Sequence, residues 1–410
     1  MRHRFAGWGF GAVATLLAGV ATAEPAVFED LVAIESPIKG VAQEPYIAAA
    51  GDALVMSWMA PKGSDTYVQF ARLESAGWSD PVTVVRGDDL FVNWADFPSV
   101  MPFGDAGIAV HWLRKAGRSG YDYNVELAIS RDQGATWSAP MVPHSDRSEA
   151  QHGFVTMNGA PDGSLDLLWL DGRAYGKVGL QDSPDAMQLR ATRFDPGGGL
   201  MPDRAVDIQT CSCCQTSSAR LGDGSLVVAY RDRTDAEIRD ISVVRLNNDT
   251  WSGPVSVHED GWEISGCPVN GPAIAAQDTR VAVAWYTGAD DVAAVKVAFS
   301  DDGGAHFGAP ARIDLGEPLG RVDALFLEDG SVLVTWLEWQ GDDEVLMVCR
   351  AVAGQGCVTR QELARNAAAG SMNFPRMARS GGDVYLAWTE PVDAYQSTVR
   401  IMRGTPPAFE

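Results

Sequence analysis

The sequence predicts an all-β protein folded as a β-propeller of seven four-stranded blades, and three observations carry this prediction. Seven apolar runs that end in an aromatic residue recur roughly every 50 to 60 residues, a period typical of stacked repeats. Turn signals such as Asp162-Gly163 and Asp223-Gly224 precede most of these runs. Almost no stretch has the spacing of an amphipathic helix. The runs are ALVMSW, GIAVHW, LDLLW, SLVVAY, RVAVAW, SVLVTW and DVYLAW, ending at Trp58, Trp112, Trp169, Tyr230, Trp285, Trp336 and Trp388.

Each repeated unit contains four predicted strands in a fixed order. A short apolar run before the turn, such as PYIAAA, PSVMPF or GPAIAA, predicts the first strand, and the run that ends in an aromatic residue predicts the second. Runs like VELAIS and VKVAFS predict a third strand, and SAPMVP and GAPARI a fourth. A single small sheet cannot bury both of its faces, so neighbouring blades must cover them and ring closure must protect the edges. A ring of six blades is the alternative.

The two ends of the chain are expected to meet in the last blade. The final unit begins at Met372 and stops after its third strand near Met402. The segment AVFEDLVAIES, near the N-terminus, can supply the missing strand. We therefore expect this N-terminal strand to close the ring.

The first 23 residues have the features of a secretory signal peptide. The cationic start MRHR is followed by the apolar run FAGWGFGAVATLLAGVA and by Ala21-Thr22-Ala23, an A-x-A cleavage signature. The apolar run is shorter than the ~20 residues that a spanning helix needs. We expect residues 24–410 to form one propeller domain, periplasmic or secreted, without a membrane anchor.

The charge of the chain restricts its partners. The formal net charge is −22 at pH 7, so nucleic acid and anionic membrane surfaces would be repelled. The remaining expectation is a monomer that binds a small-molecule or glycan ligand.

One local motif is repeated along the chain. The segment SRDQGATWSAP places Ser130, Asp132, Gly134 and Trp137 in the pattern S-x-D-x-G-x-x-W, and SDDGGAHFGAP repeats it with Phe307 as the aromatic residue. The Asp is expected to accept backbone N–H bonds, the Gly to take a positive φ, and the aromatic ring to pack beneath the hairpin. We interpret this motif as a structural device without catalytic function.

These motifs resemble the Asp-box repeats of the sialidase superfamily, over nearly the whole chain after the signal peptide. The resemblance implies a propeller, six-bladed in sialidases, with three arginines that clamp a carboxylate, a Tyr nucleophile with a Glu partner, and an Asp acid. The residues that could take these catalytic roles are Asp96, Arg173, Arg231, Arg233, Arg321 and Glu338, with Tyr286 or Tyr175 as the nucleophile.

One element of the sialidase pattern is missing. Where the superfamily has its first-blade arginine, this chain reads Glu44-Pro45-Tyr46. Bidentate arginine pairing is what holds a carboxylate. We therefore expect a member of the superfamily without classical sialidase activity.

Polar residues are expected to gather at one face of the ring. The loop before the first strand of a blade, here called its leading loop, lies on the same face as the loop after the second strand. This rule places four candidate ligand-binding residues together: His152, Asn270, Tyr286 and Asn373.

Four cysteines fall in two successive leading loops. Cys211, Cys213 and Cys214 precede blade four, and Cys267 precedes blade five. Two structural disulfides are one interpretation, favoured by export. A bond between the adjacent Cys213 and Cys214 would be strained. The other interpretation is a thiolate site for copper or zinc as the cofactor.

Cys349 and Cys357 flank a predicted hairpin turn in VCRAVAGQGCV, which favours a structural disulfide between them.

Three hypotheses about function follow. The first is an exported propeller that binds or processes a small or glycan-type ligand at the face that carries the Cys, Arg, His and Asp residues. The second is a glycoside hydrolase of the exo-α-sialidase type. The third is a periplasmic copper- or zinc-binding propeller.

Overall fold

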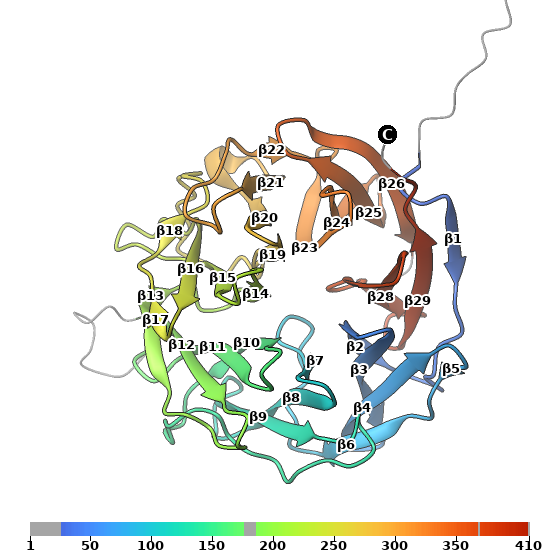
Figure 1. Cartoon of the computed structure of the whole chain (residues 1–410), viewed down its shortest axis with the longest axis vertical. Coiled ribbons are helices and arrows are strands. Elements are labelled where there is room, and N and C mark those ends of the chain that lie inside the picture. The colour runs from blue at the N-terminus through green and yellow to red at the C-terminus, as the bar shows by residue number, and fades with distance from the viewer. Residues whose placement is uncertain (1–25, 176–185, 368–369, 409–410) are drawn as a thin grey trace, which may run out of the picture.

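The chain folds into a ring of seven antiparallel sheets (Figure 1). The structure is a computed structural model, and it describes residues 26–175, 186–367 and 370–408. The predicted signal peptide, residues 1–23, lies outside the described residues. Seven blades are present, so the seven-bladed prediction is confirmed and the alternative of six is wrong. Within the described ranges, no helix has the length and apolar character to cross a membrane.

The first three blades come from the N-terminal half of the chain. Blade one consists of β2 (Gln43–Ala50), β3 (Ala53–Lys62), β4 (Asp65–Glu74), β5 (Gly77–Trp78) and β6 (Val82–Gly87). Blade two consists of β7 (Ser99–Phe103), β8 (Gly107–Lys115) and β9 (Tyr123–Ser130). Blade three consists of β10 (His152–Gly159), β11 (Leu165–Asp171), β12 (Met187–Phe194) and β13 (Arg204–Thr210).

The next three blades follow in chain order. Blade four consists of β14 (Ser217–Arg220), β15 (Leu226–Arg231), β16 (Ile241–Asn247), β17 (Thr250–Trp251) and β18 (Val255–Ser256). Blade five consists of β19 (Ala273–Gln277), β20 (Arg280–Thr287), β21 (Ala294–Ser300) and β22 (Ala311–Arg312), with the short 3₁₀ helix η1 (Ala289–Asp291) between β20 and β21. Blade six consists of β23 (Pro318–Phe326), β24 (Val332–Gln340), β25 (Asp343–Val352) and β26 (Gly356–Asn366).

Both ends of the chain build blade seven. Its inner strands are β27 (Arg376–Ser380), β28 (Asp383–Pro391) and β29 (Ser397–Thr405), and its outermost strand is β1 (Asp30–Ala33). β1 pairs antiparallel with β29, with Asp30 opposite Thr405. Figure 1 shows the blue N-terminal strand lying along the red C-terminal one. The predicted closure of the ring by the N-terminal strand is confirmed.

Blade two differs from the pattern expected for the fourth strand. The segment SAPMVP forms only an isolated bridge, between Met141 and Leu127. Pro143 has no backbone N–H to donate at the next hydrogen-bonded position, so the ladder stops after Met141, whereas on the other side Ser138 N still donates to Ile129 O at 2.9 Å.

The second strand of each blade carries the most deeply buried aromatic residue. All seven aromatic residues that ended the apolar runs are at most 2% exposed. A strand in the middle of a blade is covered by the blades on both sides, which explains why these runs are continuously apolar. Several indole N–H groups donate to carboxylates, as Trp169 does to Asp171 and Trp336 to Glu338, both at 2.8 Å.

The S-x-D-x-G segments are turns held by their own side chains. Gly134 N donates to Ser130 Oγ at 2.7 Å, and Thr136 N donates to Asp132 Oδ1 at 2.8 Å. The Trp137 ring packs edge-on against Phe70 of blade one, with centroids 5.4 Å apart. The second copy repeats both backbone bonds around Ser300 and Asp302.

Candidate functional site

Five blades share an unusual backbone feature in the leading loop or at the start of the first strand. Each has there one non-glycine residue at a positive φ between 50° and 57°. In blades one, three and six this residue lies at a register shift at the start of the first strand. Such bulges re-aim side chains next to functional sites, and the strain they hold is typical of such sites. The residues are Glu44, Phe154, Val269, Arg321 and Asn373.

Hydrogen bonds join these loops around the ring. Phe154 N donates to Asp96 Oδ1 at 2.7 Å, which links blade two to blade three. Arg321 N donates to Asn270 Oδ1 at 2.8 Å, which links blade five to blade six. Asn373 Nδ2 donates to Glu44 Oε1 at 2.6 Å, which links blade seven to blade one. The structure therefore includes the predicted residues Asp96, Asn270, Arg321 and Asn373 in one system of interblade contacts.

Gln215, which the sequence analysis did not single out, bonds to the loops of two other blades. Its Nε2 donates to Ala95 O at 2.6 Å in the loop before blade two, and its Oε1 accepts from Gly271 N at 3.1 Å at blade five. It follows directly after Cys214, so it anchors the loop that holds Cys211, Cys213 and Cys214, here called the cysteine loop, to the leading loops of blades two and five.

An exposed aromatic residue lies against Arg321. The guanidinium carbon of Arg321 is 4.7 Å from the centroid of the Trp94 ring, and that ring stacks on Phe374 with centroids 6.0 Å apart. Trp94 is 40% exposed, whereas the seven aromatic residues that end the second-strand runs are at most 2% exposed. Arg321 also contacts Ser371 and lies 3.4 Å from Glu344. We call Trp94, Arg321, Phe374 and their neighbour Glu44 the central cluster.

Two buried carboxyl groups, Glu44 of the central cluster and Asp96, have raised pKa values. Burial raises the pKa of Glu44 to about 8, against the opposing effects of Asn373 and two arginines. Burial also raises the pKa of Asp96 to about 7, although Phe154 N and the Tyr123 hydroxyl donate to it. Carboxyls that titrate near neutral pH are suited to proton transfer.

Arg376 is a second residue that sequence reasoning missed. Its guanidinium carbon is 5.2 Å from the Tyr46 ring centroid and 5.3 Å from that of Phe97, and its Nη1 is 3.6 Å from Asp323. Its Nε has no hydrogen-bond partner among the described residues. A cavity of about 50 Å³ lies beside it and beside Asp96. In the sequence, Arg376 could have been found as the arginine of NFPR, which begins the first strand of blade seven.

The other predicted arginines are engaged with their own neighbours. Arg231 is buried, and its guanidinium donates to the backbone carbonyls of Asn270, Arg239 and Tyr286 at 2.6–3.0 Å. It therefore fastens blade four to blade five. Elsewhere on the ring, Arg173 pairs with Asp171 at 2.7 Å and lies 3.4 Å from Asp203, and Arg233 pairs with Glu237.

The residues predicted as the nucleophile pair lie in separate surroundings. Glu338 is buried and accepts bonds from the Trp336 indole at 2.8 Å and from Leu315 N at 3.0 Å. Tyr286 packs edge-on against Trp262, with ring centroids 5.6 Å apart, and Tyr175 is 48% exposed. A catalytic role for Glu338 or for either tyrosine stays a prediction.

His152 belongs to a buried polar group in blade three. Its ring stacks on His144 with centroids 3.9 Å apart, and its Nε2 is 3.2 Å from Asp146 and 3.7 Å from Asp171. Arg173 and the Trp169 indole both donate to Asp171. These bonds give His152 and Asp171 a role in holding the blade together, and a ligand-binding role for His152 stays a prediction.

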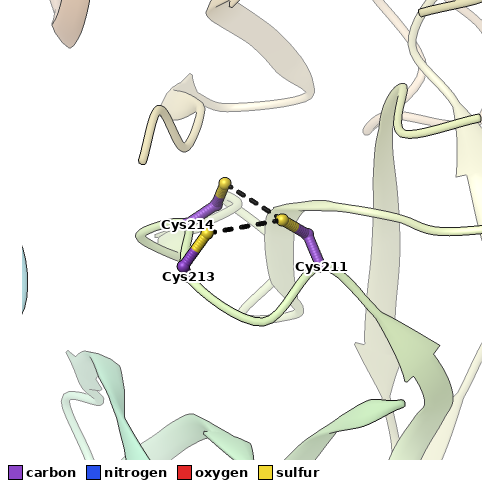
Figure 2. A group of neighbouring side chains, drawn as sticks. All are labelled: Cys211, Cys213 and Cys214. Carbon is purple, nitrogen blue, oxygen red and sulfur yellow. Dashed lines mark hydrogen bonds between the residues drawn. The ribbon is translucent and has the colours of Figure 1, made fainter. Parts of the chain in front are cut away.

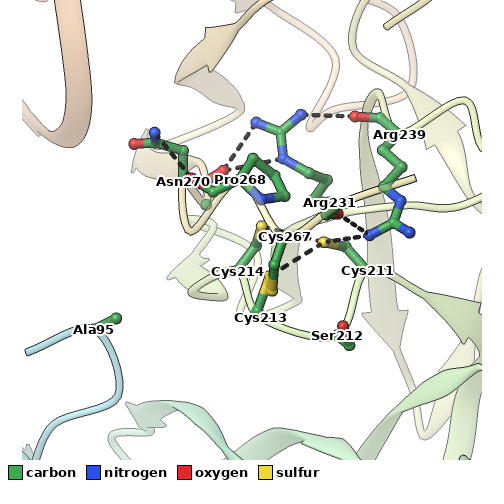
Figure 3. The surroundings of a disulfide bond; sticks show 12 residues. Ala95, Cys211, Ser212, Cys213, Cys214, Arg231, Arg239, Cys267, Pro268 and Asn270 are labelled. Carbon is green, nitrogen blue, oxygen red and sulfur yellow. Dashed lines mark hydrogen bonds between the residues drawn. A yellow bond between two sulfur atoms is a disulfide. The ribbon is translucent and has the colours of Figure 1, made fainter. Parts of the chain in front are cut away.

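The cysteines form one interblade disulfide and leave two thiols beside it (Figures 2 and 3). Cys213 bonds to Cys267, with Cα atoms 5.9 Å apart, which ties blade four to blade five. Cys211 and Cys214 are buried thiols, with sulfur atoms 3.2 Å apart. The sequence left two disulfides or a copper or zinc site open, and the structure instead combines one disulfide with a thiol pair. A metal role stays a prediction. The predicted disulfide between Cys349 and Cys357 is present.

Comparison with known proteins supports the fold. No family model matches the chain, and no curated protein matches it in sequence. A Dyadobacter fermentans protein of unknown function is similar in structure, with a TM-score of 0.54 and 14% identity over 93% of this chain and 99% of that one. An ulvan lyase solved with a bound saccharide gives a TM-score of 0.56 at 11% identity, over 90% of this chain and 94% of the lyase. The endosialidase of phage phi92 gives 0.51 at 10% identity, over 96% and 72%.

These likenesses, at such low identity, show a shared architecture. The chain is a seven-bladed β-propeller, and the proteins with similar structures include polysaccharide lyases and an endosialidase. A propeller can host unrelated activities, so the function must be argued from the site itself.

Proposed function

We propose that the central cluster binds a glycan, and that this exported propeller binds or processes it without classical sialidase chemistry. The observation that carries the proposal is the exposed Trp94 ring, which has the Arg321 guanidinium 4.7 Å from its centroid. An aromatic ring with one end in water offers apolar contact area, and a neighbouring guanidinium offers several fixed hydrogen-bond donors. Sugar rings present both apolar C–H faces and hydroxyl acceptors, which such a pair matches.

The surrounding carboxyls add the means to process a bound sugar. Glu44 is protonated at neutral pH because burial raises its pKa to about 8. Asp96, with a pKa of about 7, is present in both protonation states there. Such pKa values are suited to proton transfer, and both side chains are 2% exposed in this structure. The polysaccharide lyases among the similar structures support a carbohydrate as the ligand class.

Binding to a panel of polysaccharides and oligosaccharides tests this proposal. The panel should contain neutral, uronate-bearing and sialylated glycans, with affinity measured by calorimetry. We expect wild-type protein to bind at least one class, and Trp94→Ala to weaken that binding by about tenfold or more, since aromatic contacts dominate such sites.

A matched control is Ile208→Ala, because Ile208 is also exposed, at 55%, but lies on the outermost strand of blade three. This variant should bind like wild type. Binding that Trp94→Ala leaves unchanged, or a wild-type protein that binds nothing in the panel, would contradict the proposal.

A further inference from the structure

The cysteine loop contains a Cys-x-x-Cys pair that lies next to the Cys213–Cys267 disulfide. Cys211 and Cys214 are three positions apart, and their sulfur atoms lie at 3.2 Å (Figure 2). Cys211 Sγ is also 4.0 Å from Cys213 Sγ, which is bonded to Cys267. One thiol therefore lies close to both its thiol partner and a disulfide sulfur, the arrangement that thiol–disulfide exchange requires.

The four cysteines differ in how far they are exposed to solvent. Cys211 and Cys214 are at most 1% exposed and Cys213 is 8% exposed, whereas Cys267 is an exposed residue. Among the four cysteines, Cys267 is therefore the residue that an external disulfide can approach, whereas Cys211 and Cys214 are covered. Any exchange of electrons with the buried pair must pass through the Cys213–Cys267 bond.

Positive charge surrounds the first thiol. Arg239 Nη1 lies 3.5 Å from Cys211 Sγ (Figure 3). A neighbouring guanidinium favours the thiolate, which is the attacking species in exchange. Cys211 Sγ is also the thiol sulfur that lies 4.0 Å from Cys213 Sγ, so Cys211 is the nucleophile of the pair.

We propose that the four cysteines form a thiol–disulfide relay, which carries two electrons from the buried Cys211–Cys214 thiols to an external disulfide by way of Cys267. The inference is independent of the proposed glycan binding. It would give this propeller a second activity, as a donor of reducing equivalents to a small-molecule or protein disulfide.

The relay begins within the protein. The Cys211 thiolate attacks Cys213 Sγ, the Cys213–Cys267 bond breaks, and Cys267 leaves as an exposed thiolate. Cys267 then attacks the external disulfide, which forms a mixed disulfide and releases the first external thiolate.

Two further exchanges complete the transfer of two electrons and leave Cys211 and Cys214 as a disulfide. Cys214 loses its proton and attacks Cys211, which forms the Cys211–Cys214 disulfide and releases Cys213 as a thiolate. Cys213 attacks Cys267 in the mixed disulfide, restores the original interblade bond and releases the second external thiolate. The external disulfide gains two electrons, and the protons from Cys211 and Cys214 end on the two released thiols.

The first test uses wild-type protein and N-ethylmaleimide without any reductant. Internal exchange exposes Cys267 as a thiolate, so label should accumulate on Cys267 together with a Cys211–Cys213 bond in peptide maps. Label that never reaches Cys267 would overturn the relay. This measurement needs no variant, so it does not depend on whether a cysteine mutant folds.

The second test follows oxidation by glutathione disulfide. Wild-type protein should form the Cys211–Cys214 bond and release two molecules of glutathione. The double variant C213S/C267S should oxidise that pair more slowly by about tenfold or more, because buried thiols are inert to bulky reagents. The matched control C349S/C357S, which removes the other disulfide, should retain the wild-type rate.

Two outcomes count against the relay. Equal rates of Cys211–Cys214 oxidation in wild type and C213S/C267S would show that electrons do not leave the buried pair through Cys267. One equivalent of copper or zinc bound to Cys211, Cys213 and Cys214 in the purified protein would replace the relay by a metal site. Neither outcome bears on glycan binding, which is measured separately at Trp94.

Discussion

Asn373 donates a 2.6 Å hydrogen bond to Glu44, and the two residues are 329 positions apart in the chain. The bond crosses the seam between blade seven and blade one, on the inner side of the ring. The pairing of β1 with β29 closes the ring on its outer side. The chain ends are therefore held at two places, and the inner one is part of the candidate site.

Replacing Glu44 by Gln should change how stability depends on pH. The folded pKa of Glu44 is about 8 and the ordinary value is 4.5. Between these values the folded protein keeps the proton and the unfolded chain has lost it, so wild-type stability falls as pH rises from about 5 to 8. Glu44→Gln removes this pH-dependent contribution to the free energy of unfolding. At about 1.4 kcal/mol per pKa unit, wild type should lose a few kcal/mol more than the variant as the pH rises through this range.

Urea unfolding of both proteins at several pH values measures this effect. The Gln oxygen can still accept from Asn373, so the variant should fold normally. Parallel pH profiles for wild type and Glu44→Gln would show that Glu44 does not hold its proton in the folded state.

We expect no sialidase turnover. A buried carboxyl, Glu44, stands where a sialidase has its first-blade arginine, and Arg231 is occupied by three backbone carbonyls. A fluorogenic sialoside assay checks this expectation. Robust release of sialic acid that disappears in Asp96→Asn would refute it.

Replacing Arg231 by Met should strongly destabilise the protein. The change removes the Arg231 donors from three carbonyl groups, two of them on the buried residues Asn270 and Arg239, at about 1–3 kcal/mol each, so we expect a loss of roughly 3–9 kcal/mol. Thermal and urea unfolding measure the loss. Arg400→Ala is the control, since Arg400 forms an exposed ion pair with Glu390, and its stability should stay near wild type. A loss no larger than that of the control would show that these bonds contribute little.

Deleting residues 24–36 should expose the outer edge of blade seven. Without β1, the backbone groups of β29 become an exposed sheet edge, and such edges pair with other chains. We expect a lower melting temperature and concentration-dependent association, seen by calorimetry and size-exclusion chromatography. A truncated chain that stays monomeric and as stable as residues 24–410 would show that closure by β1 is dispensable.

The two disulfides should differ in their contribution to stability. The sequence separation is 54 residues for Cys213–Cys267 and 8 for Cys349–Cys357. Loop-closure entropy predicts a loss of about 4 kcal/mol for Cys267→Ser and roughly 2–3 kcal/mol for Cys357→Ser under oxidising conditions. Urea unfolding of each variant gives the two values, and a reversed order would show that loop length does not govern them.

The sequence by itself determined the architecture. The repeated apolar runs ending in an aromatic residue predict strands buried on both faces. Each blade has such a strand, covered by its two neighbouring blades, so the pattern can be seen in each repeat separately. The incomplete last unit likewise required a strand from elsewhere, and residues 30–33 provide it. The pairing of Cys349 with Cys357 could be read from a hairpin, because the contact is local.

Only the tertiary structure decided which polar residues meet. Trp94 and Arg321 come from loops of different blades, and no local pattern encodes their contact. The same is true of Arg231, whose sequence context suggested a ligand-facing arginine but whose partners are carbonyls of the next blade. Whether a side chain faces a ligand or a neighbouring blade depends on long-range packing, so the ring had to be assembled before the central cluster and the cysteine pair could be seen.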